Sequence, residues 1–264
     1  MKTPDVIAFD FDGVICDGLI EYFKTAWQAY CQLFKPADQT PPEGLTARFY
    51  KLRPVIETGW EMPLMLKAVL EGYADAEIME QWPKMAEPWL TAAGLSPKDA
   101  ANAVDGVRDR WIQSDLDSWL EQHQFYPGLL EVLASALSTL PTYIVSTKES
   151  RFIQKLLRQN GVDIDAQQIF GKDVKRPKYE TLRQLKEKHT GGAQSPAIWF
   201  IEDRIKALQV VKQQSDLTEV TLFLADWGYN LEPDRQAARE DARIHLLSLE
   251  QVVQEFEFWV EGRG

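Results

Sequence analysis

The chain has 264 residues, of which 45% are hydrophobic and 26% charged, a composition typical of a folded globular protein with one or two domains. Its formal net charge of −11 at pH 7 argues against a nucleic-acid partner, because binding to a polyanion draws on clustered lysine and arginine. No segment reaches the run of about 18 apolar residues that a membrane span needs, which argues against a membrane protein.

The cysteines and the first residues bear on the compartment. Cys16 and Cys31 form neither a disulfide framework nor a zinc-binding spacing, so we expect reduced thiols. The first residues lead directly into an apolar run and show no signal-peptide pattern. We therefore expect a cytoplasmic protein.

The first predicted element is a strand that ends in acidic residues. Residues 6–9 form a short apolar run, typical of a strand buried on both faces, and Asp10, Asp12 and Gly13 follow it. Buried carboxylates at the end of a core strand are costly unless a cation or another partner compensates for them, and open α/β sheets bind their ligands at this end of the strands. A solvated turn is the simpler alternative. An EF-hand calcium loop is excluded, because its sixth position requires glycine and is Ile15 here.

A helical region separates this strand from the next one. Residues 19–34 have apolar and aromatic side chains at helical spacing, and no convincing strand follows before about residue 124. Further helices are predicted at residues 46–57, 63–71, 76–82 and 97–121.

Two features of this helical region bear on its role. Its tryptophans are most simply the core of a small helical subdomain. The segment 52–61 combines a cation, acids and an aromatic ring around helix breakers, and Arg53 within it is a candidate substrate contact, with an exposed salt bridge as the alternative. The tryptophans are Trp27, Trp60, Trp82, Trp89, Trp111 and Trp119.

Strands and helices alternate after residue 125. Such repeated βα units with apolar strands predict an α/β fold with a doubly wound parallel sheet. The predicted strands are residues 142–145, 197–201, 220–225 and 244–247, and the predicted helices are residues 129–140, 148–160, 179–189, 204–214 and 249–260.

Four stretches, in this order along the chain, resemble the motifs of the haloacid dehalogenase-like (HAD) hydrolase superfamily. The first motif, an apolar strand followed by Asp-x-Asp-Gly, matches residues 10–13. The second, a strand that ends in serine or threonine, matches Ser146. The fourth, an apolar strand followed by two acidic residues, matches Glu202 and Asp203. The matching positions span nearly the whole predicted core.

The third motif of the superfamily is a lysine near the start of a helix. The basic turn at residues 172–178 offers three lysines, and a solvated turn is the alternative for any one of them. The common form Lys-Pro-x-Pro would place Arg176 where lysine is expected. A second form, a lysine that opens the helix four residues before a leucine, selects Lys178 with Leu182. We prefer Lys178 and keep Lys175 as the second candidate.

The resemblance implies a mechanism of phosphoryl transfer. Asp10 would attack phosphorus to form an aspartyl-phosphate, and Asp12 would act as general acid and then as general base. Mg²⁺ would be held by Asp10, Asp203 and the main-chain carbonyl of Asp12, with Glu202 as a ligand or a neighbour through water.

The resemblance also implies the remaining site residues. The hydroxyl of Ser146 would bind a phosphate oxygen, and Thr147 and Lys148 beside it are further candidates for substrate binding. The lysine of the third motif, Lys178 or Lys175, would hold the nucleophile carboxylate and the phosphate together.

A Rossmann-like core domain is expected from residues 1–18 and 125–264, and an α-helical cap domain from residues 19–124. The predicted function is that of a Mg²⁺-dependent phosphatase acting on a small phosphorylated metabolite. Asp12 favours phosphate chemistry, because family members that cleave carbon–halogen bonds do not need this acid/base residue. The alternatives are a phosphomutase on the same scaffold and a non-catalytic HAD-like binding protein. The sequence identifies neither the substrate nor the oligomeric state.

Overall fold

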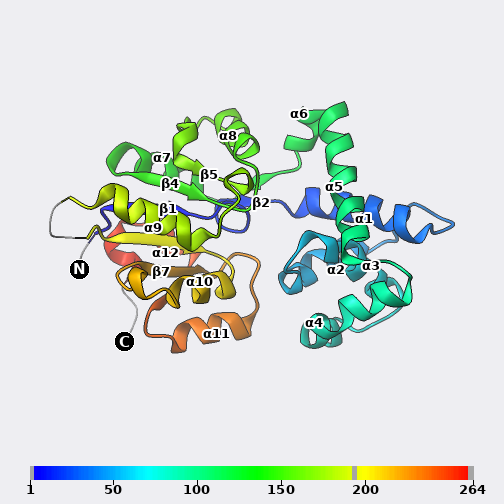
Figure 1. Cartoon of the computed structure of the whole chain (residues 1–264). Coiled ribbons are helices and arrows are strands. Elements are labelled where there is room, and N and C mark those ends of the chain that lie inside the picture. Colours follow the sequence, from blue (N-terminus) through cyan, green and yellow to red (C-terminus); the bar gives the residue numbers. More distant parts are fainter. Residues whose placement is uncertain (1–2, 192–194, 261–264) are drawn as a thin grey trace. The chain divides into compact units, whose positions relative to one another are not determined.

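The computed structural model describes residues 3–191 and 195–260, and the chain divides into two compact units (Figure 1). The core unit contains the chain up to Asp17 and from Gln124 onward. The inserted unit is the segment between them, Gly18–His123. None of the helices in the described part of the chain is both long and apolar enough to cross a membrane.

The core unit is built on a six-stranded sheet in which all neighbouring strands are parallel. The strand order is β5-β4-β1-β6-β7-β8, so the chain builds one side of β1 first and then crosses to the other side. This order confirms the predicted doubly wound α/β fold and places the switch point, where such folds bind ligands, between β1 and β6. The strands are β1 (Val6–Phe9), β4 (Thr142–Val145), β5 (Ile169–Phe170), β6 (Ile198–Glu202), β7 (Thr221–Ala225) and β8 (Ile244–Leu247).

Both faces of this sheet are covered, which is why its strands are mainly apolar. All residues of β1 and β6 are buried. Alternate side chains of the strands point to opposite faces, and Trp259 contacts Phe9, Trp199 and Phe223 on one of them. The other face packs against α9 and α10 through residues that include Val6, Ala8, Phe200, Leu182, Leu185, Leu208 and Val211.

The helices of the core unit differ from the prediction in three places. The helix predicted at residues 249–260 is a short helix followed by a 3₁₀ turn, Phe256–Trp259. The helix predicted from residue 148 begins at Ser150. The helix α11 was not predicted, because only Ala238 of its residues is buried and it has no apolar period. The helices are α7 (Leu129–Thr139), α8 (Ser150–Gln159), α9 (Lys178–His189), α10 (Ile205–Lys212), α11 (Glu232–Glu240) and α12 (Leu249–Val252).

A small antiparallel pair of strands lies where the chain leaves and re-enters the core unit. It consists of β2 (Cys16–Asp17) and β3 (Gln124–Phe125), with Cys16 opposite Phe125. Strands of two residues are too short to show a period of two, so the sequence did not indicate them. This pairing brings together the two points of the core unit at which the inserted segment begins and ends.

The inserted unit is helical, as predicted, and no strand lies between Gly18 and His123, all of which the structure describes. Three of the six tryptophans, Trp27, Trp82 and Trp119, are buried in its interior, and the other three are half-buried. Its helices are α1 (Leu19–Phe34), α2 (Leu45–Leu52), α3 (Met62–Leu70), α4 (Asp75–Ala92), α5 (Pro97–Ser114) and α6 (Leu116–Leu120).

Three helices of this unit differ from the prediction. The helix predicted at 46–57 ends at Leu52, and a 3₁₀ turn, Arg53–Val55, follows it. The helix predicted at 97–121 breaks at Asp115, whose carboxylate accepts a hydrogen bond from the Ser118 N–H and caps α6. The helix predicted at 76–82 continues to Ala92 through Pro83 and Pro88. Both prolines lie on the exposed side of α4, where water can satisfy the carbonyls that lose their partners.

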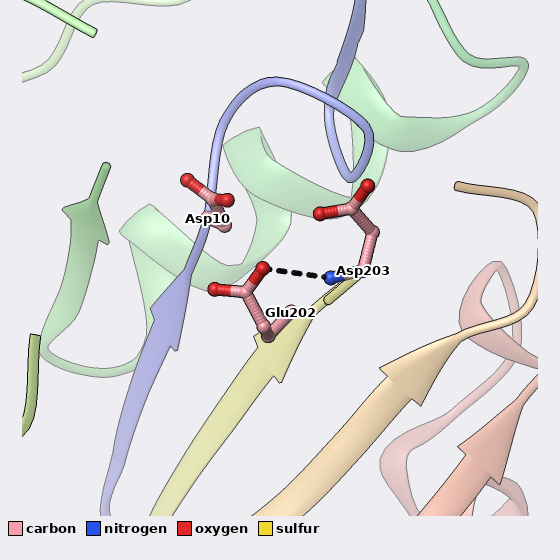
Figure 2. Close-up of side chains that lie close together, drawn as sticks. All are labelled: Asp10, Glu202 and Asp203. Atoms are coloured by element: carbon pink, nitrogen blue, oxygen red, sulfur yellow. Dashed lines mark hydrogen bonds between the residues drawn. The ribbon is translucent and has the colours of Figure 1, made fainter. Parts of the chain in front are cut away.

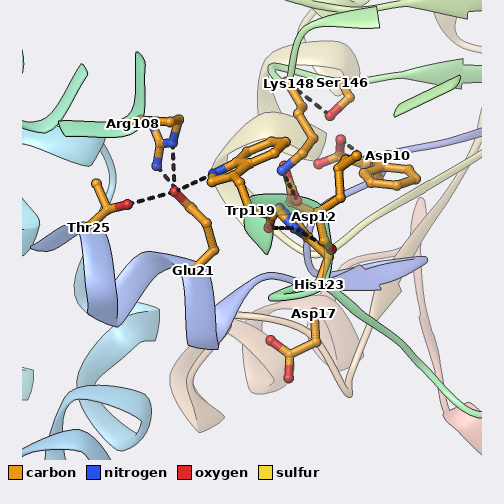
Figure 3. A network of polar contacts seen from close by, with 12 residues as sticks. Asp10, Asp12, Asp17, Glu21, Thr25, Arg108, Trp119, His123, Ser146 and Lys148 are labelled. Carbon is orange, nitrogen blue, oxygen red and sulfur yellow. Dashed lines mark hydrogen bonds and ion pairs between the residues drawn. The ribbon is translucent and has the colours of Figure 1, made fainter. Parts of the chain in front are cut away.

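A buried carboxylate connects three helices of the inserted unit (Figure 3). Glu21 of α1 is fully buried and accepts hydrogen bonds from Arg108 Nε of α5 (2.8 Å) and from Trp119 Nε1 of α6 (3.1 Å). The hydroxyl of Thr25 donates a third bond to it at 2.8 Å. Because the buried charge is paired and fully hydrogen-bonded, removing either charged partner is expected to destabilise this unit.

Candidate active site

The loop after β1 holds two of the predicted site residues in a tight turn. The carbonyl of Phe11 accepts hydrogen bonds from the N–H groups of residues 14, 15 and 16, and Gly13 N–H donates to the Cys16 carbonyl (2.8 Å). Asp10 N–H donates to the carbonyl of Ile201 in β6 at 2.8 Å. The backbone that carries Asp10 and Asp12 is therefore fixed on both sides.

Two glycines allow this loop to approach the end of β6. Gly13 has φ of +85°, and a Cβ atom there would lie 2.2 Å from Asp203 Oδ2. A Cβ atom on Gly228, after β7, would lie 2.3 Å from the Cβ of Asp203 and 2.5 Å from the Gly13 carbonyl oxygen. Only glycine fits at these two positions, because any side chain would displace Asp203.

Three carboxylates gather at the carboxyl ends of β1 and β6 (Figure 2). Asp10, Glu202 and Asp203 are buried and offer oxygen atoms that all lie within 4.8 Å of one another. The sequence placed these three residues at strand ends, and the fold brings them together because neighbouring parallel strands end at the same edge of a sheet. Among the described residues, the carboxylate of Asp12 is not part of this group.

Lys178, the first residue of α9, reaches this group. Its Nζ lies 2.8 Å from Asp10 Oδ2 and 2.6 Å from Glu202 Oε2. The second candidate, Lys175, is exposed and has a left-handed backbone with φ of 50° at the end of a 3₁₀ turn. Of the two lysines that the sequence left open, Lys178 is the one that the structure brings to the carboxylates.

The carboxylates of Glu202 and Asp203 are held differently. Glu202 accepts bonds from Lys178 and from the N–H groups of Asp203 (3.1 Å) and Arg204 (3.0 Å), so both of its oxygens are engaged. Asp203 Oδ2 accepts one bond from the N–H of Tyr229 at 2.8 Å. Asp203 is therefore better placed than Glu202 to offer an oxygen to a metal.

The pKa values of this group reflect excess negative charge in a buried site. Burial raises the pKa of Asp10 to about 7; Lys178 opposes the shift and Glu202 adds to it. The pKa values of Glu202 and Asp203 are also raised, chiefly by burial. Burial alone would lower the pKa of Lys178, but the charges of Asp10 and Glu202 outweigh it and raise that pKa. Three carboxylates face one ammonium, and a bound divalent cation would balance the difference.

The predicted phosphate contacts follow β4. Ser146 is buried, its N–H donates to the carbonyl of Phe170 at 2.9 Å, and its hydroxyl accepts from Lys148 N–H at 3.3 Å. Thr147 is exposed. Lys148 extends to Asp12, with Nζ 3.1 Å from Oδ1.

Arg53, the predicted substrate contact, belongs to the inserted unit. It begins a 3₁₀ turn, Arg53–Val55, and its Nη1 donates to the carbonyl of Ile56 at 3.2 Å. Its guanidinium carbon lies 4.8 Å from the centre of the Tyr22 ring. Contacts within the inserted unit therefore hold this side chain in place.

The segment after β7 supports the site. Besides the bond from Tyr229 N–H to Asp203, the side chain of Asn230 donates to the carbonyls of Asp203 (3.0 Å) and Ala225 (2.8 Å). Trp227 Nε1 donates to the carbonyl of Val14 in the loop after β1. The Asn230 contacts were missed, because bonds to main-chain carbonyls leave no pattern in the sequence.

Comparison with known proteins establishes the class. The model of the haloacid dehalogenase-like hydrolase family matches residues 4–213, so the chain belongs to this family and is a hydrolase. It is similar to a haloacid dehalogenase-like family hydrolase from Streptococcus pneumoniae, with a TM-score of 0.56 and 15% identity over 93% of this chain and 94% of that one. It is also similar to a predicted phosphatase from Clostridium acetobutylicum, with a TM-score of 0.58 and 14% identity over 96% and 97%. At these identities the two likenesses show a common fold, and no curated protein matches the chain.

Proposed function

We propose that this hydrolase is a magnesium-dependent phosphatase that removes the phosphate group from a small phosphorylated metabolite. The observation that carries the proposal is the buried group of Asp10, Glu202 and Asp203 with Lys178 bonded to two of its members. Phosphoryl transfer asks a protein mainly for positioning and charge neutralisation. A carboxylate nucleophile fixed beside a cation, at the switch point of the sheet, supports this chemistry.

The donor atoms of the site fit a magnesium ion. All three side chains of the group offer carboxylate oxygens, the ligands that hard cations prefer, and their excess negative charge requires a counter-charge. Asp10, Asp203 and the main-chain carbonyl of Asp12 would hold the ion, while Glu202 holds Lys178. A bound Mg²⁺ supplies charge stabilisation to the phosphoryl oxygens.

The residues of the chain act in two half-reactions, formation and hydrolysis of an aspartyl-phosphate. Asp10 attacks phosphorus to form an aspartyl-phosphate as Asp12 gives a proton to the leaving alcohol oxygen. Asp12 next takes a proton from the water that attacks this intermediate, and inorganic phosphate leaves Asp10. Lys178 and the hydroxyl of Ser146 stabilise the phosphoryl oxygens.

The size of the substrate and the compartment belong to the same proposal. The net charge of −11 argues against a polyanionic substrate and favours a small ester bound by a few local cations. Both cysteines of the chain are unpaired, Cys16 being buried, which supports the reducing cytoplasm as its compartment.

Chelation of divalent cations should abolish turnover of p-nitrophenyl phosphate, and added Mg²⁺ should restore it. Asp203→Asn should raise the Kd for Mg²⁺ by at least about 10- to 100-fold, the loss typical of a partner that only supports a ligand. Calorimetric titration of the metal-free protein with Mg²⁺ measures this Kd independently of activity. Asp226→Asn is the matched control, because Asp226 follows β7 as Asp203 follows β6 and is not part of the carboxylate group.

Two outcomes would contradict different parts of the proposal. Undiminished turnover by metal-free protein in EDTA would exclude magnesium dependence. Absence of turnover on all of a panel of phosphorylated metabolites, with Mg²⁺ bound, would instead favour a non-catalytic binding protein.

Arg53→Ala should lower kcat/KM on the best metabolite of such a panel by about 10- to 100-fold, the value of a hydrogen bond to a charged group. Hydrogen bonds to the buried Glu61 hold the segment that follows Arg53: Glu61 accepts bonds from the Thr58 hydroxyl (2.7 Å) and Trp82 Nε1 (2.9 Å). Arg110→Ala, an exposed arginine of the same unit, is the control. Equal kcat/KM for Arg53→Ala and wild type would show that Arg53 does not contribute to substrate recognition.

A further inference from the structure

The side chain of Lys148 pairs with Asp12, a contact that a simple role in phosphate binding does not explain (Figure 3). Its Nζ lies 3.1 Å from Asp12 Oδ1 and 3.5 Å from Oδ2. In the described part of the chain, Lys148 is the hydrogen-bond and ion-pair partner of this carboxylate. The Asp12 carboxylate, which we expect to transfer protons, is thus held by a single cation, the ammonium group of Lys148.

Hydrogen bonds hold the backbone of both residues of this pair in place. The N–H of Lys148 donates to the Ser146 hydroxyl, and its carbonyl accepts from Lys172 N–H at 2.9 Å. Gly171 makes this close approach possible, since a Cβ atom there would lie 2.3 Å from the Lys148 carbonyl oxygen. The turn after β1 fixes the backbone of Asp12 in the same way. The pair therefore connects two rigid loops, those after β4 and β1.

We propose that Lys148 is a positioning residue, which orients the Asp12 carboxyl group for proton transfer. This inference rests on the proposed phosphatase function. Asp12 must give its proton to the ester oxygen while the P–O bond breaks, and then accept a proton from water while the new O–P bond forms. A carboxyl group on a short side chain can rotate away from the ester oxygen and from the attacking water. Holding it in a reactive geometry accounts for much of its contribution to the rate.

The test compares two esters that differ in their need for an acid. The p-nitrophenolate group leaves as a stable anion, whereas phenolate from phenyl phosphate gains much more from protonation. The ratio kcat/KM reports only the steps through formation of the aspartyl-phosphate. Lys148→Met should lower kcat/KM for phenyl phosphate by about 10- to 100-fold, within the 10²- to 10⁴-fold that acid–base help is worth, and change it little for p-nitrophenyl phosphate.

Coupling to Asp12 provides a second measurement. Since Lys148 acts through Asp12, the double variant Asp12→Asn/Lys148→Met should be no slower on phenyl phosphate than Asp12→Asn alone. Lys148→Arg, which keeps the charge and the donors, should recover part of the loss. Lys172→Met is the matched control, because it removes a neighbouring exposed lysine that does not touch Asp12. It should leave the ratio of the kcat/KM values for the two esters unchanged.

Three results would overturn parts of this account. Equal losses of kcat/KM on both esters, with weaker inhibition by inorganic phosphate, would assign Lys148 to phosphate binding. Equal losses with a lower Tm would assign it a structural role only. If the wild-type protein hydrolyses neither ester with Mg²⁺ bound, the proposed function itself fails and this inference fails with it.

Discussion

Replacing Asp10 with asparagine should abolish turnover of every phosphate ester, with a loss in kcat of at least about 10⁴-fold, because removing a covalent nucleophile leaves no alternative path of similar rate. The protein should remain folded. Asp10 is one of three buried carboxylates around a single ammonium, and Lys178 keeps Glu202 as a partner at 2.6 Å. Removing one negative charge from this crowded group should therefore not lower the Tm of the metal-free protein.

Steady-state rates, acid quenching for a protein-bound phosphate, and thermal melts measure these effects. Asp226→Asn serves again as the control and should keep both turnover and the phosphoenzyme. A stable phosphoenzyme in Asp10→Asn would show that another residue is the nucleophile. A large drop in Tm without metal would show that Asp10 serves mainly to neutralise Lys178.

Asp12→Asn should separate the two half-reactions. With p-nitrophenyl phosphate the leaving group needs little acid help, whereas hydrolysis of the aspartyl-phosphate still needs a base for water. Losing that base should slow the second step by about 10²- to 10⁴-fold and make it rate-limiting. Rapid quench should therefore show a burst of about one p-nitrophenolate per active site, followed by a slow steady rate.

The intermediate itself provides the control for this experiment. The phosphate that accumulates in Asp12→Asn should be stable in acid, sensitive to hydroxylamine, and absent from Asp10→Asn/Asp12→Asn. If both half-reactions slow equally and no phosphoenzyme accumulates, Asp12 does not act as the base. A structural or metal-positioning role would then be the better account.

The elements that depend on local pattern could be predicted from the sequence. The runs at residues 6–9 and 198–201 are apolar because both faces of the sheet are covered, and each is followed by acidic residues. Asp10 and Asp203 could be placed at strand ends for this reason. The helical character of residues 18–123 could also be predicted, because its apolar residues recur at helical spacing.

The third-motif lysine shows where local pattern was insufficient. Lys172, Lys175 and Lys178 lie within seven residues of an irregular turn, so spacing alone did not determine which side chain faces the carboxylates. The backbone decides: Lys175 adopts a left-handed conformation in an exposed position, whereas Lys178 opens α9 beside Asp10 and Glu202.

The sequence by itself determined the fold class, the family resemblance and the acidic residues at the strand ends, because each of these follows from neighbouring residues. Only the tertiary structure decided the contacts between distant segments: the pairing of Cys16 with Phe125, the support of Asp203 by Tyr229, and the pairing of Lys148 with Asp12. Partners more than 20 residues apart are brought together by the packing of the sheet and by close approaches that glycine permits. Neither of these can be deduced from the pattern of neighbouring residues.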